Sequence, residues 1–292
     1  MTPSHTSQAT PQNPDGPRAS RPTLSRITIY PVKALDGLDL REVEIGPEGA
    51  LVGDRRFAMF DAAGKFVHGK RTPKVHLLRT TFSGDLSKIS LRRPGDTSES
   101  TFALSPGNGE LSVFLSAWFG FPVSLRENLA HGFPDDLDAP GPTVICESTI
   151  AAVADWFTPA SAAPEETGEG HISPDNMAAR LRANLLVSGS PAFAEDALVP
   201  KAGSEKVFRI GAVDVAATGA CARCIVPTRD PFTGEAQRGF QRRFMEQRKI
   251  TLPAGTEVSR FDHYFRLSLN TRIHRPFRGK ILRVGDPVHW HA

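Results

Sequence analysis

Cysteine is scarce in this chain, and the number present is odd. Three cysteines among 292 residues are too few for a disulfide framework. The chain also lacks any apolar run of about 18 residues, the length that spans a bilayer as a helix. These two absences predict reduced thiols, a cytoplasmic location and no contact with a membrane.

An excess of charge of one sign is also missing. The 35 basic and 32 acidic residues give a formal net charge of +3, which is too balanced for a nucleic-acid-binding surface. With 39% hydrophobic and 23% charged residues, the composition is that of a globular protein. Glycine and proline are abundant, at 25 and 24 residues, and predict many turns and short strands.

The first segment, residues 1–22, has almost no large apolar side chain. It is rich in Pro, Ser, Thr, Gln and Asn, so it cannot bury enough surface to offset its ordering entropy. It also lacks the apolar centre of a signal peptide and the Arg-rich pattern of a transit peptide. We therefore expect residues 1–22 to form a disordered tail.

Short alternating strands are predicted over most of the next hundred residues. Ile27 and Ile29 fall on one face of the first of them. Further strands are expected at residues 43–45, 56–60, 75–79 and 89–92. Because Gly and Pro break the chain between them, these segments favour a barrel or a sandwich.

Apolar spacing of three and four residues predicts two helices in the middle of the chain. The first covers residues 111–118 and ends at Gly120 as its C-terminal cap. The second begins after Ser148 as N-cap. The Pro- and Asp-rich connector between them, residues 133–142, is expected to be a domain boundary or a surface loop. Residues 158–175 are polar and predict an exposed loop.

The C-terminal half predicts further strands and one charged helix. Residues 185–187 indicate a buried strand, and residues 208–215 indicate a hairpin around Gly211. The helix carries Phe240 and Phe244 on one side. Strict alternation over residues 264–271 predicts a half-buried strand, followed by a turn and a closing strand at residues 284–288.

The chemical centre of interest is the pair Cys221 and Cys224, with Arg223 between them. A structural zinc site would need further Cys or His ligands, and Cys146 is the only other cysteine. A thioredoxin-like motif would open a helix, which the prolines soon after the pair disfavour. Spacing alone leaves two interpretations open: two small buried thiols in a strand, or one thiolate that binds a metal cofactor beside an anchoring arginine.

Short motifs occur in one order along nearly the whole chain. They are Ile29–Lys33 with Gly37, Gly53–Phe57, Arg71 with Pro73, Arg180–Leu185, Phe193–Asp196, Cys221–Gly234 and Val284–Asp286. In this order they resemble the motifs of the MOSC family, which includes bacterial YcbX-type proteins and mitochondrial amidoxime-reducing components. The resemblance departs at Ala34, where the family has a serine, and at Arg71, which lies one residue closer to the proline than the family's arginine.

The resemblance implies a mixed α/β, β-rich fold. An N-terminal β-barrel-like domain, residues 23–130, would pack on a MOSC β-barrel with peripheral helices, residues 141–290. It also implies a molybdenum cofactor, in which a molybdopterin dithiolene and one protein cysteine bind the metal. The family's ligand is the second cysteine of the pair, so Cys224 is implied as metal ligand and catalytic residue, in keeping with the softness of a thiolate.

By motif position, the resemblance also implies a set of residues that bind the pterin and its phosphate. They are Lys33, Arg55, Arg71, Arg182, Asn184, Arg223 and Asp230. The ordinary roles of such residues are solvated surface charge, a strand-edge amide and a turn cap. Cys146 lies outside every motif and is expected in the core.

The implied function is a molybdenum-dependent oxidoreductase. It would remove oxygen from N-hydroxylated, or from N- or S-oxygenated, small molecules. Three cysteines are one too few to ligate an iron–sulfur cluster in this chain, so the electrons would come from a separate donor protein. The alternative is a non-catalytic protein that carries or delivers the cofactor.

Overall fold

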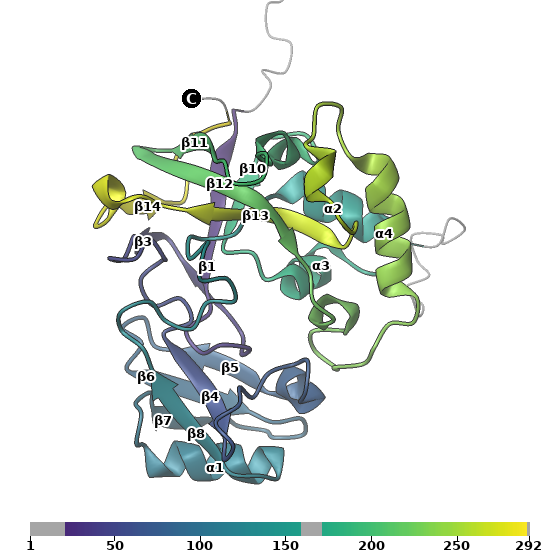
Figure 1. The fold of residues 1–292 in the computed structure, drawn as a ribbon. Coiled ribbons are helices and arrows are strands. Elements are labelled where there is room, and N and C mark those ends of the chain that lie inside the picture. Colours follow the sequence, from purple (N-terminus) through teal and green to yellow (C-terminus); the bar gives the residue numbers. More distant parts are fainter. Residues whose placement is uncertain (1–20, 159–170, 291–292) are drawn as a thin grey trace, which may run out of the picture.

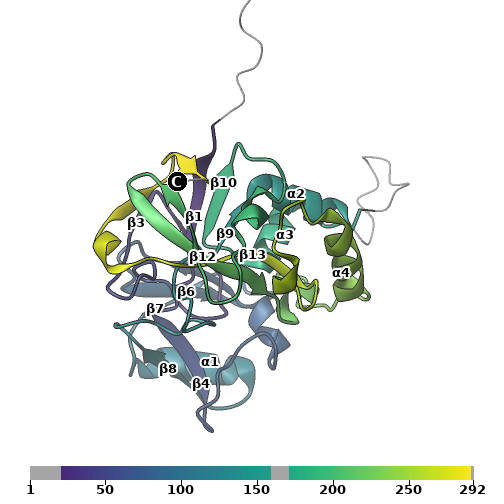
Figure 2. The same cartoon turned by 45° about the horizontal axis from the view of Figure 1, so that its top comes forward.

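The strands of the protein form two groups in the computed structural model, which describes residues 21–158 and 171–290 (Figure 1). The larger group is a curled eight-stranded sheet in the order β15-β11-β12-β13-β9-β10-β1-β2. Figure 2 shows this curl, with the paired strands β3 and β14 beside the sheet. The strands are β1 (Thr23–Ile29), β2 (Leu38–Leu40), β3 (Glu42–Glu44), β9 (Val144–Cys146), β10 (Leu185–Ser188), β11 (Lys206–Ile210), β12 (Val213–Ala222), β13 (Arg266–Arg272), β14 (Ile281–Arg283) and β15 (Val288–His289).

The beginning of the described chain is part of this large sheet. β1 pairs antiparallel with β10 on one side and with β2 on the other. Pro22 is fixed as well, because its carbonyl accepts from Val288 N at 2.8 Å, so the predicted tail ends before it. Residues 1–20 lie outside the described residues. The division into domains at residues 130–141 stays a prediction, since strands from both sides of it share one sheet.

Both faces of the large sheet are covered, which explains the continuous apolar runs of its strands. On β10, Leu185 and Val187 belong to one apolar core and Leu186 to another. The second core includes side chains of the helices that lie beside the sheet (Figure 1). These helices are α2 (Glu147–Asp155), α3 (Pro174–Leu181) and α4 (Phe240–Thr251).

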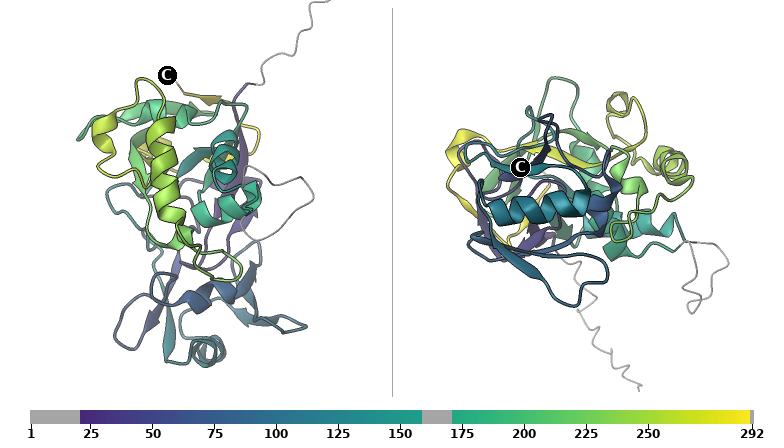
Figure 3. Two further views of the ribbon diagram at one scale, coloured as in Figure 1. Left: turned by 90° about the vertical axis from the view of Figure 1, so that its right-hand side faces the viewer. Right: turned by 90° about the horizontal axis from the view of Figure 1, so that it is seen from below.

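The smaller unit has its own apolar core, built from residues between Val32 and Leu125. β4 (Phe57–Asp61) pairs with β8 (Val123–Glu127), and β5 (Arg79–Phe82), β6 (Lys88–Arg92) and β7 (Ser100–Ala103) form a second small sheet. The helix α1 (Gly109–Phe119) crosses the far end of this unit, as the view from below shows (Figure 3). The predicted cap is confirmed, because Gly120 has a left-handed backbone with φ of 83°.

Two local predictions in the first half of the chain are wrong. Residues 73–77 form a 3-10 helix rather than the start of a strand, because Pro73 occupies its first turn, where a missing N–H costs nothing. α2 begins at Glu147, one residue before the predicted cap, since the Ser148 hydroxyl donates to the Ser190 carbonyl at 2.7 Å instead. The helix itself is confirmed.

Two further differences concern the C-terminal half. The strand β13 is not half-buried: Ser268 is buried, and its φ of 71° interrupts the alternation, so Leu267 and Leu269 pack in different cores. The predicted loop at residues 158–175 contains the start of α3, which Ser173 caps by accepting from Asn176 N at 3.1 Å. Residues 159–170 of that loop lie outside the described residues.

The mixed α/β, β-rich fold is confirmed, with four α-helices in the ranges described. None of these helices is long and apolar enough to cross a membrane.

Candidate active site

A cleft of about 1090 Å³ is lined by residues from both units. This volume is at the upper end of the range of small-molecule and cofactor sites. The predicted site residues that line the cleft are Lys33, Arg55, Arg182, Arg223 and Cys224.

The two cysteines lie where the β12–β13 ladder becomes irregular. Pairing shifts register between Ala220 and Ala222, opposite the strained backbone at Ser268. Such irregularities redirect side chains near functional sites. Cys221 is the second-last residue of β12 and Cys224 lies beyond the end of that strand, and both residues are half-buried. The interpretation as two buried thiols in a strand is therefore wrong for this pair.

Arg223 is held by protein groups on two sides. Its Nη2 donates to the Leu181 carbonyl at the end of α3 at 2.7 Å, and its Nη1 lies 3.4 Å from Cys221 Sγ. Its Nε is buried and has no hydrogen-bond partner. No carboxylate within the described ranges pairs with it. The Cys221 sulfur thus accepts a hydrogen bond from Arg223, whereas Cys224 makes no hydrogen bond to any described residue.

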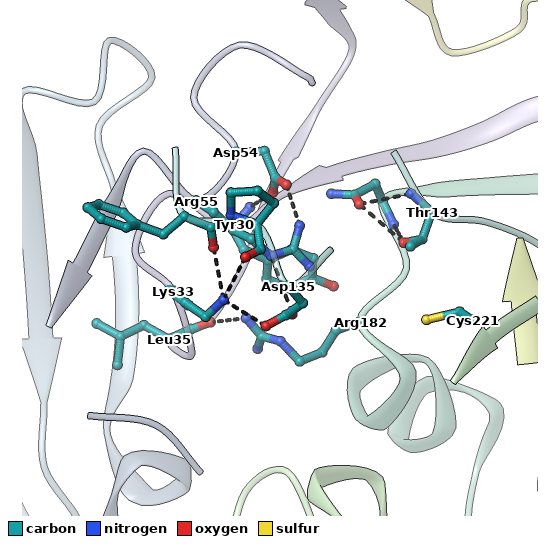
Figure 4. A network of polar contacts seen from close by, with 12 residues as sticks. Tyr30, Lys33, Leu35, Asp54, Arg55, Asp135, Thr143, Arg182 and Cys221 are labelled. Carbon is teal, nitrogen blue, oxygen red and sulfur yellow. Dashed lines mark hydrogen bonds and ion pairs between the residues drawn. The ribbon is translucent and has the colours of Figure 1, made fainter. Parts of the chain in front are cut away.

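Lys33 and Arg55 form a charged cluster with Asp135 on the other side of the cleft (Figure 4). Lys33 Nζ donates to Asp135 Oδ1 at 2.7 Å and to the Phe133 carbonyl at 2.9 Å. Burial lowers the pKa of Lys33, and Asp135 offsets part of that effect. Burial alone would raise the pKa of Asp135, but Lys33 and Arg55 hold it below its ordinary value. The predicted connector, residues 133–142, therefore supplies part of the site.

Arg182 ends α3 in a left-handed conformation, with φ of 51°. Its guanidinium lies over the Tyr30 ring, 4.0 Å from the centroid, and donates to the Leu35 carbonyl at 2.7 Å (Figure 4). No described carboxylate pairs with it. Two other residues that line the cleft, Ala34 and Arg55, also have positive φ, at 77° and 50°. Left-handed backbone at non-glycine residues is rare and gathers at functional sites.

Arg71 does not line the cleft. Its side chain is half exposed and pairs with Asp61 at 3.4 Å. The neighbouring Lys70 lines the cleft instead. The signal was present in the sequence, because Lys70 stands at the full three-residue spacing before Pro73 that the family's arginine has.

Asn184 and Asp230 also lie off the cleft lining, and protein groups use their polar atoms. Asn184 is buried, accepts from Thr143 N at 3.1 Å and donates to the Thr28 carbonyl at 3.0 Å, so it ties neighbouring strands together. Asp230 accepts from Phe232 N at 2.8 Å, which caps the turn. It pairs with Arg180 at 3.6 Å and not with Arg223.

Several residues that line the cleft were not among the predicted set. Among them are His68, Lys70, His76, Arg79, Arg180 and Arg229. Lys70, Arg180 and Arg229 lie in or next to recognised motifs, whereas no motif marks His68, His76 and Arg79. They come together only because loops from both units meet.

The arrangement fits a soft metal held mainly by ligands from a cofactor. No group of three or more His, Cys, Asp or Glu side chains in the described part of the chain could bind a metal ion by itself. A dithiolene would supply the missing sulfur ligands beside Cys224. Arg182 and Arg223, which lack carboxylate partners, suit a phosphate. The zinc interpretation has no such support.

Together these features define a β-rich protein of two units with a thiol and several cations facing one cleft. The family described as MOSC N-terminal beta barrel domain matches residues 21–114, and the MOSC domain matches residues 146–289. The chain belongs to the MOSC family, which confirms the resemblance of its motifs. This family is associated with binding of the molybdenum cofactor.

The amidoxime-reducing relatives have low sequence identity to this chain but align with most of it. Mitochondrial amidoxime reducing component 2 of Macaca fascicularis is 23% identical, over 91% of this chain and 83% of that protein. Mitochondrial amidoxime-reducing component 1 of Homo sapiens is 24% identical, over 91% of this chain and 82% of that protein. The crystal structure of the YUAD protein of Bacillus subtilis aligns with 92% of this chain and 94% of its own, at 11% identity and a TM-score of 0.36.

Proposed function

We propose that this MOSC protein is a molybdenum-cofactor-dependent reductase. Its substrates would be N-hydroxylated or related N- or S-oxygenated small molecules, and a separate donor protein would supply the electrons. The observation that carries the proposal is the position of Cys224, which opens onto a large cleft beside arginines without carboxylate partners. The named amidoxime-reducing relatives support the substrate class.

Different residues of the cleft would bind different parts of the cofactor. Cys224 would bind the metal, and Arg182 and Arg223 would bind the anionic part of the cofactor. Lys33 and Arg55 are partly buried at the cleft wall and pair with Asp135 and Asp54, so they would position the cofactor mainly through hydrogen bonds. When bound, the cofactor would supply the redox chemistry, and the protein its orientation and field.

The cysteines of the sequence support the proposal that a separate protein donates the electrons. Cys146 is buried, and burial raises the pKa of its thiol, so it is a core residue. Cys221 and Cys224 open onto the cleft. The three cysteines of these 292 residues are one fewer than a four-cysteine cluster needs.

The test is a turnover assay with cofactor-loaded protein and a chemical donor. Reduced viologen replaces the unknown donor protein, and benzamidoxime serves as the substrate. We expect many equivalents of viologen to be oxidised per chain, because Cys224 would keep the metal on the protein between cycles. A carrier would release a single cofactor equivalent to a cofactor-free acceptor enzyme and show no repeated turnover, and that result would overturn the proposal.

A further inference from the structure

One wall of the cleft joins two segments that are far apart in the sequence. His76 and Arg79 come from the smaller unit, and Arg229 and Phe232 come from the loop that follows Cys224. Arg79 links the segments: its Nη2 donates to the Pro231 carbonyl at 3.1 Å, and its guanidinium lies 5.2 Å from the Phe232 ring centroid. All four side chains line the same cleft as Cys224.

Close packing fixes His76 in this wall. A Cβ added to Gly69 would lie 2.5 Å from His76 Nε2 and 3.4 Å from Val226 Cγ2. A Cβ added to Gly234 would lie 3.4 Å from His76 Cβ. The imidazole is therefore held between a glycine of its own unit and the loop after Cys224, without the slack that a surface side chain has.

The charges of the wall do not balance. Arg79 pairs with Asp36 at 3.3 Å, and the carboxylate of Asp230 is used by Arg180. Arg229 has no carboxylate partner among the described residues. Its Nη1 donates to the Gly234 carbonyl at 3.0 Å, and its Nε is buried and unpaired.

His76 adds an uncharged polar group next to this cation. Burial, together with Arg182, Arg229 and Arg79, lowers the pKa of His76 to about 4, so the ring is neutral at physiological pH. Its Nε2 is buried and has no hydrogen-bond partner. The half-buried guanidinium of Arg229 is the element of an oxyanion-binding site, because it gains from a charged acceptor. The neutral ring of His76 packs beside it and leaves its positive charge uncompensated.

We propose that this wall, formed by Arg229 and His76, binds an acidic group of the substrate, such as a carboxylate. The inference rests on the proposed function and narrows its substrate class to anionic N-oxygenated compounds. A phosphate of an extended cofactor has the same chemistry and is the competing source of the anion. The substrate is favoured as the source of the anion, because Arg182 and Arg223 have no carboxylate partners and already suit the cofactor phosphate.

The test compares a neutral probe with an acidic probe of the same scaffold. Benzamidoxime is the neutral probe, and meta- and para-carboxybenzamidoxime are the acidic ones. We expect kcat/KM of the wild-type protein to favour an acidic probe. Arg229→Gln should lower the acidic-to-neutral ratio of kcat/KM by about tenfold or more, mainly through KM, because a charge-assisted pair is lost. Arg229→Lys should keep most of the ratio.

Arg242→Gln is the matched control, since it removes the same charge from α4, where the side chain is 83% exposed. It should leave the ratio unchanged. An equal loss on both probes in Arg229→Gln would show that Arg229 only shapes the loop. A loss of molybdenum and pterin from Arg229→Gln would assign the anion to the cofactor. Either result overturns the substrate subsite.

A binding measurement separates this inference from the proposed function. If wild-type protein turns over neither probe, the proposed function is wrong, and calorimetric titration with the acidic probes still tests the subsite. The subsite predicts about tenfold weaker binding of the acidic probe to Arg229→Gln than to wild type. Equal affinities would overturn it.

Discussion

Cys221 and Cys224 share one motif but differ in what surrounds them. Cys221 lies near the end of β12 and within hydrogen-bond distance of Arg223. Cys224 lies beyond the strand and makes no hydrogen bond in the ranges described. A sulfur that accepts no hydrogen bond keeps its lone pairs for a metal, so we expect Cys224, whose side chain also lines the cleft, to be the ligand. The asymmetry of the pair is therefore a property of their places in the fold.

This asymmetry predicts different effects of two similar substitutions. Cys224→Ala should remove nearly all bound molybdenum from protein made in a cofactor-competent host, whereas Cys221→Ala should keep most of it. Inductively coupled plasma mass spectrometry gives the metal content, and thermal melts check that both variants fold. Equal losses from the two changes would instead favour a site that uses both thiols, such as a zinc or redox pair.

At the residue scale, motif order identified fewer than half of the lysines and arginines that line the cleft. The predicted ones are Lys33, Arg55, Arg182 and Arg223. It failed for Asn184, whose amide holds strands together, because hydrogen-bond partners are set by tertiary contacts. Arg229 was not predicted, because only the folded structure shows that its side chain lines the cleft and pairs with no described carboxylate.

Helix ends show how local chemistry decides an element. Gly120 ends α1 with φ of 83°, and a Cβ there would meet nothing within 4 Å. Gly120→Ala should therefore lower the free energy of unfolding by about 1 kcal/mol through backbone strain alone. The matched control is Gly109→Ala at the start of the same helix, which has open space and an ordinary φ, and should be neutral or stabilising. Urea unfolding measures both, and equal effects would contradict the cap.

The short 3-10 helix Ala194–Leu198 carries two buried carboxyl groups. Glu195 Oε2 accepts from Thr149 Oγ1 at 3.0 Å, and burial together with the neighbouring Asp196 raises the pKa of Glu195 to about 7. Asp196 pairs with the buried Arg248 at 2.6 Å. This 3-10 helix thus connects α2 and α4 through hydrogen bonds and an ion pair between buried polar groups.

Glu195 should make stability depend on pH. Its folded pKa of about 7 lies above the unfolded value of 4.5, so its contribution is fully present below pH 4.5 and is lost as the pH rises through 7. Glu195→Gln should flatten the fall in unfolding free energy over this range. Glu246→Gln, an exposed change on α4, should not. Urea unfolding at several pH values tests this, and identical slopes for wild type and Glu195→Gln would refute the assignment.

Elements with strong local signals were predictable, and those set by distant contacts were not. α1 has both apolar periodicity and a glycine cap, and was predicted nearly to its ends. α3 begins in a polar stretch and is stabilised by packing in the second core, so its periodicity was missed. β13 alternates in sequence, yet its two faces are both covered and Ser268 interrupts the pattern.

At the scale of the whole molecule, the cleft forms where the two units pack together, since residues of both units line it. Strands from the beginning of the chain pair with strands of the C-terminal half: β1 with β10, and β3 with β14. The connector between the units returns Asp135 to Lys33. Alternating segments and the family resemblance predicted a β-rich fold, but the order of the strands and the meeting of loops depend on long-range pairing that no local pattern reports.

The central claim is that this cleft holds a molybdenum cofactor through Cys224. The most direct measurement is the molybdenum and pterin content per chain of protein made in a cofactor-competent host, by mass spectrometry of the metal and fluorescence of the released pterin. We predict close to one molybdenum and one pterin per chain. Protein that carries zinc, or no metal and no pterin, would contradict the claim.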